Sequence, residues 1–487
     1  MIVSLFWWID FEKENGLFGL CLGFFIIMMD TTTVPLIYTS LINEYQVTPA
    51  MVAWVNNSYL ITYASFLLFG GRLGDALNRK AVIYYALIIL ALGALLSGSG
   101  QTLIQVILGR ALMGVGAGLL TPQSMAFISI IFAQGGRGTA LGIWGAVAGV
   151  ATATGPVVTQ IFLQTAGWRW IMWINIPAAL LALIVAVICL PGTQGNGVKI
   201  KELLSSAIVG VALAAILLGL ELLNGGLQGM TTGLLLLLPG ILLVAFMLRG
   251  ELKNHKQYLL PSVLWQDRSF LRTCLISGLL GFGLTAFYLP LAYLIELRMG
   301  FGPVAISVIM VTIALANALV GPFAGHFSDK TAPETLIRWG MSCFAAATMI
   351  IGITGLMTYG EYVAFIIIIA AMALAGIGTG LAFAPLANQA FSRATFNNFG
   401  RAAAFFNVVR QMMSALGSVA IAILFDYLLH NSETKTLTNE NSLFSSGSPS
   451  VAFAAFGCFL IIAGLLGVGA WLSRTYPIVQ SVIKESK

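Results

Sequence analysis

The chain carries very little charge. Only 9% of its 487 residues are Asp, Glu, Lys or Arg, whereas a soluble globular chain contains about 25%. Apolar residues make up 59%, and they fall in long blocks rather than at the spacing of amphipathic helices or strands. These proportions exclude a soluble enzyme, a disordered chain and a disulfide scaffold. They predict a protein that lipid surrounds along most of its length.

The sequence also lacks the clusters that hold metals, nucleotides or disulfides. Its five cysteines are far apart within apolar runs, and its three histidines lie in or beside loops without forming a cluster. The glycine-rich stretch Gly114–Gly118 lacks the Lys-Ser/Thr pair that a phosphate-binding loop requires. We therefore expect no metal, no cofactor and no ATP-driven step. The net charge of +6 bears on membrane orientation, and no nucleic-acid partner is expected.

Fourteen apolar runs are long enough to cross a bilayer as helices, since a span needs about 20 residues. They are approximately 16–38, 50–71, 80–99, 102–132, 138–163, 170–190, 203–223, 231–249, 271–295, 303–325, 336–357, 361–386, 401–428 and 450–473. With the N-terminus inside, 19 Lys and Arg residues fall on the cytoplasmic side and three outside, as the positive-inside rule requires. We expect an all-α polytopic fold with both termini cytoplasmic and a first span that is retained rather than cleaved.

An internal repeat divides the chain. Gly71–Asp75 after the second span is echoed by Gly325–Asp329 after the tenth, and Arg137 before the fifth span is echoed by Arg401 before the thirteenth. The offset is nearly constant at about 260 residues, as in transporters built from duplicated halves. The repeat predicts three parts. They are a six-helix half over 1–195, two inserted linker helices over 196–255, and a second six-helix half over 256–487.

Several short motifs belong together. They are Met29-Asp30-Thr-Thr-Thr-Val-Pro35, Gly71-x-Leu73-x-Asp75-x-x-x-Arg79-Lys80, Arg110-x-x-x-Gly114-x-Gly116-x-Gly118, Gly142 with Gly155-Pro156, and Asn407-x-x-Arg410-Gln411. On these residues the chain resembles the major facilitator superfamily, and more narrowly its fourteen-span drug:proton antiporter family, which includes quaternary-ammonium-compound exporters. The resemblance implies two halves that alternate in access, and export of drugs driven by inward-moving protons.

Asp30 is the sharpest single signal. It lies deep in an apolar helix, where an ionised carboxylate is costly and burial disfavours the charged form. Arg110 lies at the same depth in the fourth span, about 12 Å below the outer surface at 1.5 Å per residue. We expect the two residues to form the proton-coupling site. The alternative is structural: a carboxylate bonded to Thr31–Thr33, and a guanidinium that binds backbone carbonyls.

Further residues are candidates for lesser roles. For a substrate or second proton site they are Glu221, Glu296, Asn407, Arg410, Gln411, Trp54, Tyr59, Tyr63, Tyr288 and, as a further cavity-lining aromatic residue, Trp144. For a latch between the halves on the cytoplasmic face they are Gly71, Asp75, Arg79, Lys80 and Asp329. For close helix packing and a hinge between the halves they are Gly142, Gly155 and Pro156. The plain alternative is that acids at span ends are solvated and that membrane aromatics only pack.

These features favour a secondary active exporter in a bacterial cytoplasmic membrane. Its partners are the bilayer, protons and amphipathic or cationic organic compounds, and we expect it to act as a monomer. A proton-coupled importer of a small nutrient on the same fold is the alternative. A membrane-embedded enzyme would need a catalytic cluster at one interface, and the sequence has none.

Overall fold

The computed structural model describes residues 11–193, 195, 197, 200–223, 226–254, 262–295, 299–300, 303–357, 360–392, 394, 398–433 and 449–474. The elements within these residues are all helices. This follows from the solvent, because a backbone surrounded by lipid must satisfy its N–H and C=O groups within its own segment. The predicted all-α fold is confirmed.

The first group of helices covers the N-terminal part of the chain. It contains α2 (Phe11–Thr33), η1 (Val34–Ile37), α3 (Tyr38–Tyr45), α4 (Pro49–Ala76), α5 (Arg79–Gly98), α6 (Leu103–Ile131), α7 (Arg137–Thr165), α8 (Trp168–Trp173) and α9 (Asn175–Cys189). The inserted pair is α10 (Ile200–Leu222) and α11 (Gly226–Asn254). The last group contains α12 (Ser262–Gln266), α13 (Arg268–Ala286), α14 (Tyr288–Tyr293), α15 (Pro303–Lys330), α16 (Pro333–Leu356), α17 (Glu361–Ser392), α18 (Phe399–Glu433) and α19 (Pro449–Leu472).

The number of spans agrees with the sequence. Within the described residues, thirteen helical stretches are long and apolar enough to cross a membrane. The remaining expected span is α4, which has 28 residues. Asn56, Asn57 and Ser58 lower its mean hydropathy, and α4 packs against three other spans, α6, α10 and α18. A helix shielded in this way can carry polar side chains, so the predicted fourteen-helix architecture stands.

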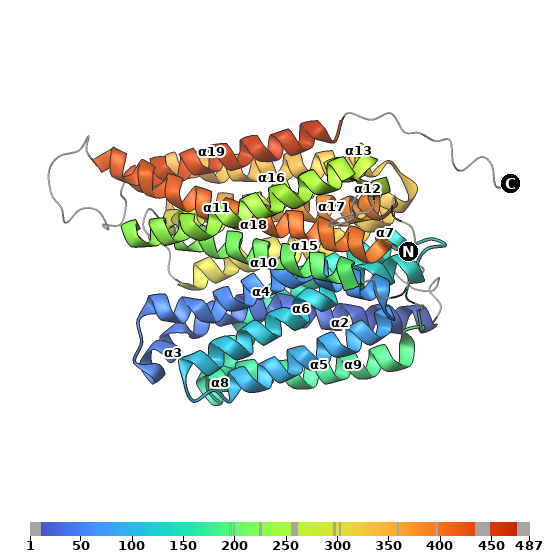
Figure 1. Cartoon of the computed structure of the whole chain (residues 1–487). Coiled ribbons are helices and arrows are strands. Elements are labelled where there is room, and N and C mark those ends of the chain that lie inside the picture. The colour runs from blue at the N-terminus through green and yellow to red at the C-terminus, as the bar shows by residue number, and fades with distance from the viewer. Residues whose placement is uncertain are drawn as a thin grey trace.

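The helices form two bundles that lie side by side (Figure 1). α2 to α9 pack among themselves, and α13 to α19 do the same. The bundles meet along two seams, where α7 packs against α15 and α4 packs against α18. The green pair α10 and α11 runs beside the second seam, with α10 on α4. The boundaries expected near residues 195 and 255 stay predictions, because 194, 196 and 255–261 lie outside the described part.

The inserted pair is attached to the N-terminal bundle by polar contacts at both ends of α10. At one end, the guanidinium of Arg72 donates to the hydroxyls of Ser205 and Ser206 over 2.7 and 2.9 Å. At the other end, Asn57 Nδ2 donates to Glu221 Oε1 over 3.0 Å. Between them, Gly210 lets α10 approach the α4 backbone, because a Cβ there would lie 2.6 Å from the Ser65 carbonyl oxygen.

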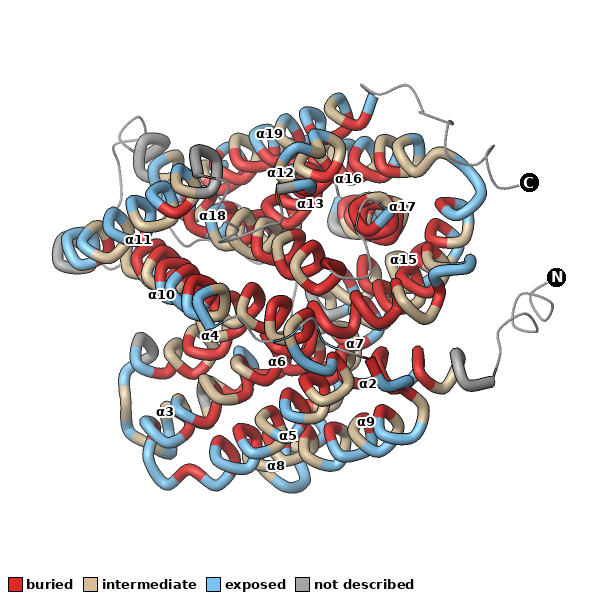
Figure 2. The backbone as a smooth tube through the Cα atoms, turned by 45° about the vertical axis from the view of Figure 1, so that its right-hand side comes forward, coloured by how far each residue is buried: buried red, intermediate tan, exposed pale blue. Residues whose placement is uncertain are grey.

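The protein is apolar both between its helices and on much of its outer surface. The buried residues line the faces along which helices meet, and the exposed ones face outward (Figure 2). Many of the outward residues are large and apolar, such as Ile188 and Phe246, each 75% exposed. A soluble monomer rarely exposes large contiguous apolar patches of this kind. The surface is therefore one that lipid chains cover.

The two ends of the bundles differ in charge. Arg72, Arg79 and Arg137 lie at one end, here named the basic end, which the charge bias predicts to be cytoplasmic. At the opposite end, Glu44 accepts hydrogen bonds from Arg169 and from Trp168 Nε1, both over 2.6 Å. The bond from Arg169 is the main reason why the pKa of Glu44 lies below its usual value. The Glu44 contacts tie α3 to α8.

Glycines allow the seam between α7 and α15 to close at the basic end. A Cβ on Gly325 would lie 2.1 Å from the carbonyl oxygen of Gly138, and one on Gly142 would lie 2.5 Å from that of Gly321. Real Cβ atoms do not come this close to backbone oxygens. The two helices therefore touch backbone to backbone, as small residues permit in membranes.

Replacing Gly325 with Ala should disrupt this seam. We expect the apparent melting temperature of the purified protein to fall by several degrees. The control is Gly464→Ala on α19, where a Cβ meets nothing within 4 Å. Both changes raise helix propensity by about 1 kcal/mol, so the difference between them isolates the packing effect. Equal melting temperatures for the two variants would contradict the close approach.

Candidate functional site

Asp30 lies where the first span changes its helical form. The hydroxyls of Thr31, Thr32 and Thr33 donate back to the carbonyls three residues earlier, over 2.7 to 3.0 Å. Pro35 has no N–H to continue the ladder, and the chain tightens into the 3₁₀ turn η1. The span predicted over 16–38 is present as one membrane-crossing stretch, Glu14–Ile37, whose last turn is 3₁₀. The Asp30 side chain, 1% exposed, lies in the last turn before the change.

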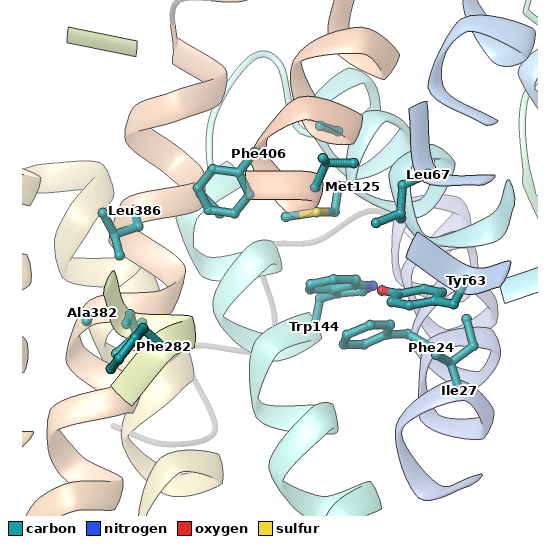
Figure 3. Close-up of a cluster of buried hydrophobic side chains, with 14 of the residues drawn as sticks. Phe24, Ile27, Tyr63, Leu67, Met125, Trp144, Phe282, Ala382, Leu386 and Phe406 are labelled. Atoms are coloured by element: carbon teal, nitrogen blue, oxygen red, sulfur yellow. The ribbon is translucent and has the colours of Figure 1, made fainter. Parts of the chain in front are cut away.

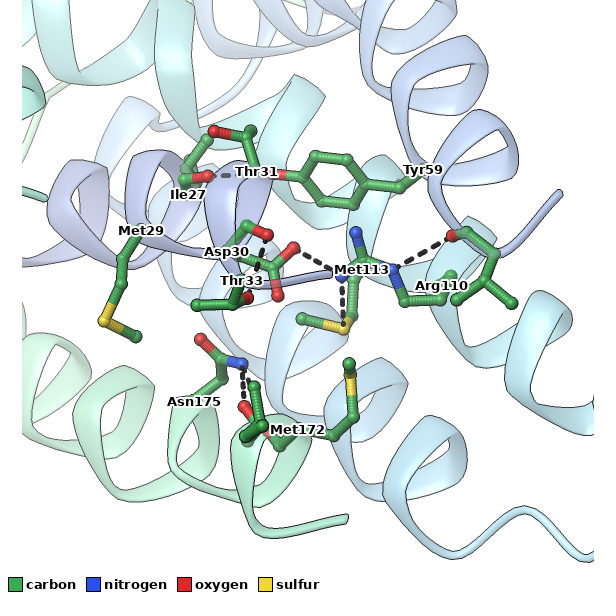
Figure 4. A network of polar contacts seen from close by, with 12 residues as sticks. Ile27, Met29, Asp30, Thr31, Thr33, Tyr59, Arg110, Met113, Met172 and Asn175 are labelled. Atoms are coloured by element: carbon green, nitrogen blue, oxygen red, sulfur yellow. Dashed lines mark hydrogen bonds and ion pairs between the residues drawn. The ribbon is translucent and has the colours of Figure 1, made fainter. Parts of the chain in front are cut away.

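Arg110 comes from α6 and forms an ion pair with Asp30 (Figure 4). Its side chain is fully buried. Its Nε donates to the Val55 carbonyl over 3.2 Å, and its guanidinium carbon lies 4.4 Å from the centre of the Tyr59 ring. The structure therefore brings together the two residues whose depth matches in sequence. It places Tyr59 beneath the guanidinium, so this ring supports the ion pair rather than lining a free surface.

The ion pair is not fully satisfied. Asp30 Oδ1 and Arg110 Nη2 are buried, and neither has a hydrogen-bond partner among the described residues. A buried polar atom without a partner costs about 1–3 kcal/mol. Asn175, which the sequence analysis did not select, lies beside this network in Figure 4, and its Oδ1 is also without a partner. The site thus has a carboxylate oxygen on which a proton can be placed.

A layer of aromatic side chains lies deeper in the bundle (Figure 3). The Trp144 ring of α7 stacks on Phe24 of α2, with centroids 3.6 Å apart and planes 14° apart. On the other bundle, Phe383 of α17 lies nearly parallel to Trp144, with centroids 6.2 Å apart. Tyr63 also lies in this layer, stacked with Tyr59. Phe24 and Phe383 were missed, because an apolar ring in an apolar helix gives no sequence signal.

The polar residues of α18 form a connected group. Arg410 Nη2 donates to Asn407 Oδ1 over 3.0 Å, and Asn407 Nδ2 reaches Met125 Sδ of α6 at 3.0 Å. The Arg410 guanidinium lies over the Phe383 ring at 4.8 Å. Gln411 is half-buried on the same helix. Two residues of the expected cluster, Arg410 and Asn407, are therefore bonded to each other, and Asn407 touches the N-terminal bundle.

Among the described residues, the other predicted site residues are not hydrogen-bonded or ion-paired with Asp30, Arg110 or Arg410. Glu221 is exposed and accepts the bond from Asn57 described above. Tyr288 is 42% exposed on α14, and Trp54 is half-buried on α4. Glu296 lies outside the described residues. The structure does not bring Glu221, Tyr288 or Trp54 into contact with Asp30 or Arg410.

At the basic end, one carboxylate of each bundle caps a helix of the other. Asp75 accepts the backbone N–H groups of Gly400 and Arg401, both over 3.1 Å, and also pairs with the side chains of Arg79 and Arg401. These amides open α18, and the partial positive charge of a helix N-terminus favours a carboxylate. Gly71 permits the approach, since a Cβ there would lie 2.5 Å from the Gly400 carbonyl oxygen.

Asp329 makes the matching contact on the repeated side. It accepts from the backbone N–H of Gly138 over 2.7 Å and from that of Thr139 over 3.0 Å, at the start of α7. Arg137 Nε donates to Asn388 Oδ1 of α17 over 2.8 Å, which is a further contact between the bundles. The internal repeat of the sequence thus appears as two symmetric contacts. Both hold the basic end closed.

Two predicted residues make contacts within the N-terminal bundle instead of between the bundles. Lys80 takes no part in the latch, because its Nζ donates to the Val187 carbonyl of α9 within the same bundle, over 2.9 Å. Gly155 permits the close helix packing that was expected, but against α2 of the same bundle, where a Cβ would lie 2.1 Å from Thr32 Oγ1. α7 continues through Pro156 as one helix to Thr165. Of the three predicted hinge residues, Gly142 alone lies on the seam with α15.

This geometry defines a class of protein. Two bundles of membrane-spanning helices meet along glycine-lined seams, are latched at one end, and enclose ionisable side chains that lipid alone would not stabilise. The chain belongs to the major facilitator superfamily, whose family model matches residues 20–418. It is a multi-pass membrane transporter of small substrates and not an enzyme.

Several relatives are similar over most of their length. The puromycin resistance protein of Streptomyces alboniger is 28% identical over 96% of this chain and 92% of its own. The methylenomycin A resistance protein of Bacillus subtilis is 26% identical over 82% of this chain and 85% of its own. The riboflavin transporter of Clostridioides difficile is 24% identical over 92% of this chain and 96% of its own.

Among solved structures, a human organic anion transporter is similar with a TM-score of 0.64 and 14% identity, covering 96% of this chain and all of that one. A proton:xylose symporter is similar with a TM-score of 0.60 and 13% identity, covering 94% of each chain. At this identity the likeness establishes the fold alone.

A double substitution tests the ion pair. Asp30→Asn leaves the Arg110 charge buried without a counter-charge, and breaking a buried pair in this way costs about 3–5 kcal/mol. Asp30→Asn with Arg110→Gln removes both charges, so we expect it to melt at a higher temperature than Asp30→Asn alone. Glu44→Gln, at a more exposed pair, serves as control and should shift melting little. A double variant less stable than the single one would contradict the pairing.

The latch formed by Asp75 and Asp329 is tested by measuring the distance between the two bundles at the basic end. We expect Asp75→Ala with Asp329→Ala to open the basic end, because each change removes a cap that joins the bundles. Spin labels at Leu77→Cys and Thr331→Cys, both exposed at this end, report their separation. The distribution should gain a longer component in the variant. Asp426→Ala, at the far part of α18, is the control, and an unchanged distribution in the latch variant would refute the role of the two carboxylates.

Proposed function

We propose that this transporter is a proton-coupled exporter of amphipathic organic compounds in a bacterial cytoplasmic membrane. The observation that carries the proposal is the buried Asp30–Arg110 pair with its unpartnered carboxylate oxygen. When a buried carboxylate that is held by one cation takes a proton, the ion pair loses one of its two charges. The attraction between Asp30 and Arg110 is then much weaker. No cofactor or nucleotide takes part, and the chain works as a monomer.

The position of the pair supports coupling to movement. Asp30 precedes the η1 turn, and Arg110 also holds the Val55 carbonyl of α4. α4 in turn forms the seam with α18 and carries the Asp75 cap. Protonation of Asp30 therefore changes a contact between three helices, one of which forms the seam between the bundles. The latched basic end corresponds to a carrier closed toward the cytoplasm.

The transport cycle follows from this arrangement. A proton from outside reaches Asp30 and weakens the hold on cargo, cargo leaves, and the carrier turns inward. The proton then departs to the cytoplasm, where the pH is higher. Coupling requires only that proton and cargo occupancy disfavour each other, and this linkage is reciprocal. Relatives named for resistance to puromycin and methylenomycin A support export.

Import of a small nutrient is the second candidate. One relative is named a riboflavin transporter, so the family in this range of identity is not limited to resistance proteins. The fold itself does not set a direction. In vesicles with an imposed pH gradient, cargo that moves against the proton flow indicates export, and cargo that moves with it indicates import.

Asp30→Asn should abolish coupling. In proteoliposomes with a pH gradient, we expect wild-type protein to move a transported dye with a proton flux of opposite sign, and the variant to show neither. Because Asp30→Asn also leaves Arg110 unpaired, the variant Asp30→Asn with Arg110→Gln is measured beside it. Asp426→Ala is the control and should transport normally. Undiminished proton exchange in both Asp30 variants would overturn the assignment.

A further inference from the structure

The aromatic layer joins the two bundles at the middle of the molecule. Trp144 belongs to the N-terminal bundle and Phe383 to the C-terminal one, and their rings are only 15° from parallel. Phe24 backs Trp144 on one side at 3.6 Å. Gly145 admits Phe383 to the surface of α7, because a Cβ there would lie 2.9 Å from its ring. When the bundles move apart, these two flat surfaces separate.

The layer also carries one uncompensated positive charge. The Arg410 guanidinium lies over the Phe383 ring and bonds to the neutral amide of Asn407. Within the part of the chain that the structure describes, no carboxylate forms an ion pair with Arg410. Asp30 does not compensate this charge, because it is paired with Arg110. A buried cation without a counter-ion favours an anionic partner.

A hydrogen-bond donor lies unused in the same place. Trp144 Nε1 is fully buried and has no hydrogen-bond partner among the described residues. In Figure 3 this nitrogen points toward the side on which Tyr63 lies. Tyr63 is in turn close enough to Arg410 to interact with it electrostatically. Both the indole N–H and the guanidinium are hydrogen-bond donors, and the guanidinium is the one that lies at the Phe383 ring.

The C-terminal side of the layer remains partly accessible. Phe383 and Arg410 are half-buried, although they lie in the interior, whereas Trp144 has no exposed surface. The geometry points to a binding site between Trp144, Phe383 and Arg410 for a flat aromatic compound that carries a carboxylate or a similar anionic acceptor. This inference rests on the proposed transport function and names the class of its cargo. It reverses the preference for cations that the carboxylate in the first span suggests.

Three fluorescent compounds that share one aromatic ring system and differ in charge show how far the charge of a ligand determines its binding. They are 9-anthracenecarboxylate, 9-anthracenecarboxamide and 9-anthracenylmethylammonium. Binding to the purified full-length protein in nanodiscs is measured by probe fluorescence at one pH, without a gradient. We expect the carboxylate to bind at least about tenfold more tightly than the ammonium, as a charge-assisted hydrogen bond implies. The neutral amide should lie between them.

Substitutions separate the contribution of the Arg410 charge to binding from that of the Phe383 ring. Arg410→Gln should weaken the carboxylate about tenfold and leave the amide nearly unchanged, whereas Phe383→Leu should weaken all three probes by a similar factor. The controls are Arg338→Gln on α16 and Phe323→Leu on the lipid-facing surface of α15. If Arg410→Gln does not yield folded protein, Arg410→Lys keeps the charge and loses the planar fork, and it should weaken the carboxylate less but measurably.

The outcomes are decisive in either direction. Ammonium binding as tight as carboxylate binding, absence of saturable binding by all three probes, or equal effects of Arg410→Gln and Arg338→Gln would overturn the inference. The measurement is independent of the proposed coupling, because it uses no gradient, and Asp30→Asn should keep the carboxylate preference. Exporter activity that survives in the Asp30 variants would thus refute the proposed function and leave this site standing. A preference for the ammonium probe would refute this binding site and leave the proposed function standing.

Discussion

Lipid offers no hydrogen bonds, and this constraint determines where the polar groups of the protein lie. The hydroxyls of Thr31 to Thr33 bond back to their own helix. The charge of Asp30 is met by Arg110, and that of Arg72 by the hydroxyls and a carbonyl at the start of α10. Polar side chains inside the bundles therefore bond either to their own helix, as the threonines do, or to a neighbouring helix, as Arg110 and Arg72 do.

The sequence was sufficient for features that depend on depth along a helix. Hydropathy gives the length of each span, and the matched depths of Asp30 and Arg110 anticipate the ion pair. The repeat of Gly71–Asp75 as Gly325–Asp329 anticipates two symmetric contacts, which the structure shows as carboxylates on the first amides of α18 and α7.

The sequence was insufficient for features that depend on rotation about a helix axis. In a soluble helix, polarity distinguishes the buried face from the exposed one, but in lipid both faces are apolar. The inward position of Phe24 and Phe383 therefore leaves no pattern in the sequence. The same reason explains Gly155, whose motif indicates close packing but not the helix against which it packs. Lys80 was misassigned because its long side chain reaches α9 instead of the opposite bundle.

The inserted pair of helices has a consequence for how the carrier keeps its lateral gap sealed. α10 is bound to α4 through Arg72 and Asn57, whereas toward α18 it presents Ile216 and Leu220, which pack on Val419. A surface of this kind can slide without breaking hydrogen bonds. We therefore expect α10 to stay with α4 when the C-terminal bundle tilts, and to keep lipid chains out of the gap between α4 and α18.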